Sequence, residues 1–186
     1  IVAGLNRRLQ GTRRRLVSAA KQNVQWTPSG RCELDSHADT CVAGANMLMI
    51  HTDGRTVKVN VYSNNYKPKS GIPIATCATV WNNPDTGEDF MLVVNATLYF
   101  GDQLDCSLWN PNQLRAQGLV VNDVPRQFQR DSTHSIIIPS QQLEIPLHLS
   151  GIISGFESRK PSLAEWEDSS IQKIELTSME AWKPAS

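Results

Sequence analysis

Short apolar runs, separated by turn-forming residues, constrain the fold of this 186-residue chain more than any other feature. Val57, Val59 and Val61 alternate with polar residues, which is the period of a strand with one buried face. Further short apolar runs that favour strands lie at 72–81, 90–100, 119–122, 135–138, 143–149, 152–156 and 171–177. In the same region only 108–118, which contains a well-placed proline and glycine, and one turn at 161–167 favour helix. The sequence therefore predicts a mostly β domain with one short helix and a closed or sandwich-like sheet.

Turn signals order the first strands into a β-meander. The dipeptide Asp53-Gly54 readily adopts the positive φ angles of a two-residue hairpin turn, and strand-like runs flank it at 47–52 and 55–61. We therefore expect a hairpin that reverses at this dipeptide. The next connection, residues 62–71, is the longest and most polar, which suits a mobile hairpin tip that can close over a groove.

The formal net charge of zero conceals a basic leader and an acidic body. Residues 1–31 contain seven Lys or Arg and no acid, which leaves eleven Lys or Arg against eighteen Asp or Glu in the remainder. We expect residues 1–30 to form a basic arm, helical or disordered, before a domain at 31–156 and a C-terminal extension at 157–186. A solvated arm is the simplest interpretation, and weak nucleic-acid contact through residues 7–21 is the alternative.

The cysteines indicate an intracellular, cytoplasmic protein with reduced thiols. Their spacing is too irregular for a Cys-x-x-Cys metal site, and the chain is too large to need a disulfide framework. The four are Cys32, Cys41, Cys77 and Cys106. We expect Cys41 to be a buried packing residue and not a nucleophile, because a reactive thiol needs an electropositive neighbour. No apolar run approaches the roughly 20 residues of a spanning helix, so we expect no membrane partner.

Polar side chains are concentrated between residues 32 and 41, in a stretch flanked by apolar residues that suit a strand entering a buried turn. Burying such groups for packing alone is costly, so a concentration of this kind favours a chemical role. We take Asp35 as the chemical centre. The candidate site residues are Asp35, Ser36, His37, Ala38 and Asp39.

Two separated segments carry a family resemblance. The run Leu34-Asp35-Ser36-His37-Ala38-Asp39-Thr40-Cys41-Val42 resembles the active-site turn of retroviral-type aspartic proteases, in which an apolar residue precedes Asp, Thr or Ser, Gly and Ala. Residues 96–118 resemble the segment that closes the protease domain of copia-type retrotransposon polyproteins. Together the matches cover about residues 31–122, and the chain is similar to the retropepsin-like protease domain of a copia-type LTR retrotransposon gag-pol polyprotein.

This resemblance implies a closed β-barrel and a homodimeric aspartic endopeptidase that needs no cofactor. A chain with one such turn supplies one carboxylate, so Asp35 and its symmetry mate would share a proton. Ser36 would brace the two turns against each other, residues 62–71 would form the flap, and the segment 108–119 would pack beneath the turn. The substrate would be the polyprotein that contains the chain, and the location would be the cytoplasm or a virus-like particle.

His37 departs from the family pattern, because it stands where the family has glycine. The imidazole could point away harmlessly, tune the Asp pair electrostatically, or mark a site that has decayed. Two other functions stay open. Asp35, His37 and Asp39 at i, i+2 and i+4 would share one face of an extended strand and suit a metal-dependent hydrolase, with His51 as a further ligand. A catalytically inactive dimerisation module with a nucleic-acid-binding leader is the third.

Overall fold

The computed structural model of this chain describes residues 30–60, 68–180 and 182. The expected basic arm therefore lies outside the described residues, except for Gly30. Most of the expected flap tip at 62–71 lies outside them too.

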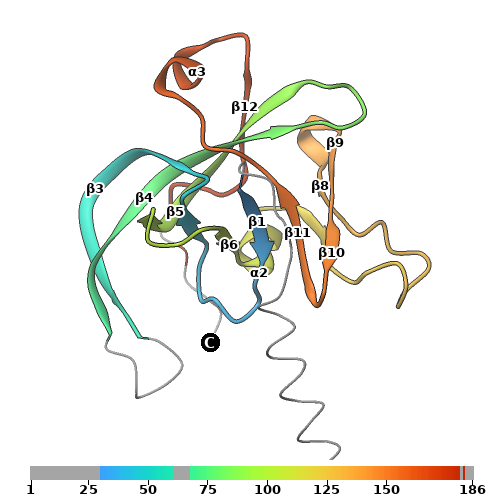
Figure 1. Cartoon of the computed structure of the whole chain (residues 1–186), viewed down its shortest axis with the longest axis horizontal. Coiled ribbons are helices and arrows are strands. Elements are labelled where there is room, and N and C mark those ends of the chain that lie inside the picture. Colours follow the sequence, from blue (N-terminus) through green and yellow to red (C-terminus); the bar gives the residue numbers. More distant parts are fainter. Residues whose placement is uncertain (1–29, 61–67, 181, 183–186) are drawn as a thin grey trace, which may run out of the picture.

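The described chain is mostly β, as predicted (Figure 1). Its helical elements are short: α2 (Pro111–Ala116), α3 (Leu163–Glu167) and the 3-10 turn η1 (Pro139–Gln141). The strands are β1 (Arg31–Leu34), β2 (Val42–Gly44), β3 (Leu48–Val59), β4 (Lys69–Asn82), β5 (Asp89–Gly101), β6 (Ser107–Trp109), β7 (Val120–Asn122), β8 (Ser135–Ile138), β9 (Leu143–Pro146), β10 (His148–Ser150), β11 (Ile153–Glu157) and β12 (Gln172–Glu175).

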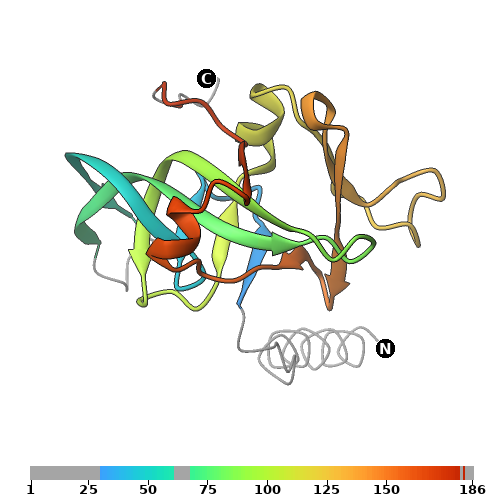
Figure 2. The same ribbon diagram turned by 90° about the horizontal axis from the view of Figure 1, so that it is seen from above.

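The strands form two sheets instead of the expected closed barrel. The larger sheet has the order β10-β11-β1-β6-β2-β5-β4-β3, with β12 pairing with β5 as a branch. Strands β7, β8 and β9 form a separate three-stranded sheet. Because β10 and β3 are the two ends of this path and are not paired with each other, the barrel does not close within the described residues. Figure 2 shows the long, curved strands β3, β4 and β5 side by side.

Parallel pairings bring the turn after β1 into the middle of the larger sheet. Strand β1 is parallel to β6, and β2 is parallel to β5. Strand β2 also pairs antiparallel with β6 at Val42 and Leu108. The turn that joins β1 to β2 is therefore attached on both sides to the segment around β6.

The predicted hairpin at Asp53-Gly54 is wrong, because β3 runs through this dipeptide without reversing. Its register against β4 shifts between Thr52 and Thr56, which is a bulge instead of a turn. The Thr52 hydroxyl accepts from the Gly54 amide, and an Asp53 carboxylate oxygen accepts from the Arg55 amide. Gly54 has φ +82°. The positive φ that a hairpin turn would need is used here in the bulge.

Most of the other predicted elements are confirmed with small shifts of their ends. Residues 72–81 lie inside β4, 90–100 lie inside β5, and 108–118 contain α2. The run at 143–149 divides into β9 and β10, which belong to different sheets. The helical turn expected at 161–167 is α3. Among the helices in the described part of the chain, none is long and apolar enough to cross a membrane.

The core includes side chains from both sheets and from the segment that follows residue 156. Trp109 and Phe156 are almost fully buried and contact each other edge to face, with ring centroids 5.2 Å apart. Leu176 is fully buried, and its amide donates to the Val93 carbonyl. Arg159 exchanges two backbone hydrogen bonds with Val80. Residues beyond 156 therefore pack on the same larger sheet.

Candidate functional site

Asp35 begins the turn that leaves β1. Its backbone amide donates to the Trp109 carbonyl on β6 at 3.1 Å, which continues the parallel pairing of the two strands by one residue. The Asp35 side chain is 35% exposed, and its Oδ1 accepts a hydrogen bond from the His37 amide at 2.9 Å. The carboxylate is thus oriented by its own turn while one side is open to solvent.

The five candidate residues share this turn but differ in exposure. Asp35 and Ala38 are half-buried, whereas Ser36, His37 and Asp39 are exposed. The His37 side chain is 76% exposed, with Nδ1 3.7 Å from Asp35 Oδ1. The described non-glycine residues with positive φ are Ala96, His134 and Gln142, so the backbone at position 37 does not require glycine. The imidazole therefore lies on the exposed side of the turn, beside the carboxylate.

Two amide side chains from the start of α2 hold the turn in place. Gln113 is almost fully buried, and its Oε1 accepts from the Cys41 amide at 2.7 Å and from Thr40 Oγ1 at 3.0 Å. Asn110 Nδ2 donates to the Ala38 carbonyl. The turn therefore has a fixed frame at Ala38, Thr40 and Cys41.

Asn110 is also the N-cap of α2. Its Oδ1 accepts from the amides of Asn112 at 2.7 Å and Gln113 at 2.9 Å. One side chain thus starts the helix and fastens it to the turn. The sequence interpretation placed this segment beneath the turn but gave neither amide a role. The available signal was Asn110 directly before Pro111, a polar N-cap before a first-turn proline.

Cys41 ends the turn as a buried group. Its Sγ accepts from the Asn110 amide at 3.3 Å, and burial raises the pKa of its thiol to about 12. Burial also raises the thiol pKa of Cys32 and Cys77 to about 12. These thiols are therefore protonated at neutral pH, which fits packing and not nucleophilic chemistry.

We expect the native protein to resist alkylation by iodoacetamide at Cys41 in mildly alkaline buffer. The thiolate is the reactive form, and burial suppresses both its formation and its access. Intact-mass and peptide mass spectrometry should find Cys41 unmodified until guanidinium chloride is added, after which it should react fully. Rapid modification of Cys41 in the native protein would contradict this placement.

The structure does not arrange the turn as the metal-site alternative requires. That alternative needs an extended strand, but residues 36–40 form turns and bends, so Asp35, His37 and Asp39 do not share one strand face. Within the described residues, no group of three or more His, Cys, Asp or Glu side chains is placed to hold a metal ion.

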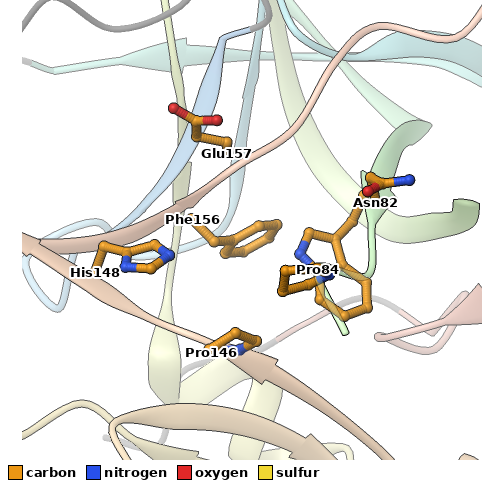
Figure 3. Close-up of a pocket in the computed structure, with 7 residues that line it drawn as sticks. Asn82, Pro84, Pro146, His148, Phe156 and Glu157 are labelled. Carbon is orange, nitrogen blue, oxygen red and sulfur yellow. The ribbon is translucent and has the colours of Figure 1, made fainter. Parts of the chain in front are cut away.

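A separate cavity of about 430 Å³ lies where β11, the end of β4, and the β9–β10 segment meet (Figure 3). In Figure 3, Phe156 lies between His148 and Pro146 on one side and Asn82 and Pro84 on the other. The cavity is lined by Trp81, Asn82, Pro84, Pro146, His148, Phe156 and Glu157. It contains none of the five candidate residues, so it is distinct from the turn.

Comparison with protein-family models, with curated proteins and with solved structures gave no match to this chain.

Proposed function

We propose that this chain is a retropepsin-like aspartic endopeptidase that acts as a homodimer, with Asp35 contributed by each copy. The observation that carries the proposal is the state of Asp35: a half-exposed carboxylate on a turn whose backbone is fixed by Trp109, Asn110 and Gln113. A rigid frame around an accessible acid is the preorganisation that acid–base catalysis needs. The sequence resemblance to copia-type polyproteins supplies the family and the polyprotein substrate.

The chemistry follows from two carboxylates held close together. Like charges a few ångström apart cannot both ionise, so the two Asp35 carboxyl groups of the proposed dimer share one proton. The ionised Asp35 accepts a proton from water, which attacks the peptide carbonyl, while the protonated Asp35 donates a hydrogen bond to the carbonyl oxygen. The tetrahedral intermediate then collapses: the C–N bond breaks, and a carboxyl proton passes to the nitrogen of the leaving amine. The hydrogen bond from the His37 amide to Oδ1 helps to fix the orientation of the carboxylate.

The position of β3 supports an extended peptide as the substrate. This strand ends the larger sheet, and in the described residues it pairs with β4 alone. Many of its side chains are exposed, and its free backbone edge can form hydrogen bonds with an added strand. Recognition by strand addition depends on backbone pairing, with pockets for alternate side chains providing specificity.

Inhibitor sensitivity tests the proposal against both alternatives. With a fluorogenic library of extended apolar peptides as substrate, we expect cleavage that is blocked by a statine-type peptide and unaffected by EDTA. The reason is that the statine hydroxyl imitates the tetrahedral intermediate between the two carboxylates, whereas no step needs a metal. The opposite pattern would favour the metal-dependent hydrolase. A dimer that cleaves nothing, but binds RNA in a salt-sensitive manner that requires residues 1–31, would favour the inactive module.

A further inference from the structure

We infer that residues 177–180 and 182 belong to an intramolecular strap that competes with a second copy of this chain for the open side of the Asp35 turn. This inference rests on the proposed homodimer and adds a form of regulation to it. The described residues of the strap are 177–180 and 182.

The strap is anchored on β5 at Thr177. The Thr177 hydroxyl accepts from the Asn95 amide at 2.7 Å and donates to the Asn95 carbonyl at 3.0 Å. Asn95 Nδ2 also donates to the Thr177 carbonyl at 2.7 Å. Both residues are buried, so this end of the strap is part of the folded core.

From this anchor the strap crosses the C-terminal end of α2 and reaches the turn. The Ser178 amide donates to Gln117 Oε1 at 3.1 Å, where Gln117 is the C-cap of α2. Trp182 is half-buried, and its Nε1 donates to the Asp39 carbonyl at 2.8 Å. The strap thus contacts the same helix and the same turn that form the candidate site.

We place the approach of a second copy on the exposed side of the turn. Ser36, His37 and Asp39 are the exposed residues of the turn, so the partner's Asp35 must come in over this surface. An indole beside Asp39 occupies part of it. Closing the dimer therefore requires the Trp182 end of the strap to move, while the Thr177 anchor can stay in place.

Removing the Trp182 contact should tighten self-association of the full chain. The net free energy of one hydrogen bond changes an equilibrium constant by about two- to tenfold. We therefore expect Trp182→Phe, which removes the N–H donor, to lower the dimer dissociation constant by about two- to tenfold, and Trp182→Ala to lower it at least as much. Sedimentation velocity over a concentration series measures this constant without requiring catalysis.

Met179→Ala is the matched control, because Met179 belongs to the same strap and is 69% exposed. We expect it to leave the dimer constant unchanged. Weaker or unaltered dimerisation of both Trp182 variants would overturn the strap while leaving the proposed protease intact. If the chain and all variants dimerise but cleave no peptide, the proposed activity is wrong. The dimer dissociation constants of the Trp182 variants still test the strap in that case. If none of them dimerises, both inferences fail.

Discussion

Asp35→Asn is expected to reduce peptide cleavage by about a thousandfold or more, within the range that general acid and base groups contribute. The amide has nearly the same shape as the carboxylate, and its oxygen can still accept from the His37 amide. It cannot take a proton from water, and a homodimer of the variant lacks the base in both halves of its site. The dimer should persist, because the frame of the turn does not depend on the charge of Asp35. Turnover of the fluorogenic peptide and sedimentation velocity measure the two effects separately.

Asp39→Asn provides the control for this substitution. Asp39 carries the same functional group in the same turn, but it is exposed, and its hydrogen bond with Trp182 uses the backbone carbonyl. We expect its turnover to stay within a few-fold of the unaltered chain, since surface charge contributes little compared with a catalytic group. Persistent cleavage by Asp35→Asn, or equal losses in the two variants, would remove Asp35 from the proposed role.

Asn110→Ala is expected to have the largest effect among substitutions outside the candidate residues. The change removes the N-cap of α2, which typically costs about 0.5–2 kcal/mol. It also removes the bond to the Ala38 carbonyl, typically a further 0.5–1.5 kcal/mol. We therefore expect the free energy of unfolding to fall by about 1–3.5 kcal/mol. Turnover should fall as well, because the turn loses one of its fixed points. Denaturant unfolding followed by fluorescence, with turnover of the same samples, measures both quantities.

Ser162→Ala is the matched control for this variant. Ser162 is the N-cap of α3, where its hydroxyl accepts from the Glu165 amide at 3.2 Å, so the substitution removes a cap without touching the turn. Its unfolding free energy should fall by about 1 kcal/mol with no change in turnover. If Asn110→Ala behaved like Ser162→Ala in both measurements, the link between α2 and the turn would be functionally irrelevant.

Local patterns in the sequence predict which segments are strands but not how the sheet is completed. The alternation of Val57 and Val59 predicts a strand with one buried face, and both residues are half-buried in β3. The confirmed α2 begins at a proline. Asp53-Gly54 misled the prediction because positive φ at Gly54 satisfies a bulge as well as a hairpin turn. Pairing with β4 determines whether Gly54 lies in a bulge or in a hairpin turn. The residues around Gly54 do not predict that pairing. The absence of barrel closure among the described strands is likewise a property of long-range pairing.

In the candidate site, too, local patterns predict some features while long-range contacts determine the others. The polar sequence around Asp35 identifies the turn, but its frame comes from Asn110 and Gln113, each 72 residues away from its partner in the turn. Trp182 is 143 residues from Asp39. A residue pattern alone also cannot give the direction of the His37 imidazole, which the structure places 76% exposed beside Asp35. Contacts of this kind depend on the topology of the sheet and follow only once it is known.

Titration of the protein with a tight-binding statine-type peptide is the most direct test of a site shared by two chains. A shared pair of Asp35 carboxylates predicts that inhibition and bound peptide both saturate at one inhibitor for every two chains. Saturation at one inhibitor per chain, on a protein that stays monomeric at the same concentration, would contradict the account.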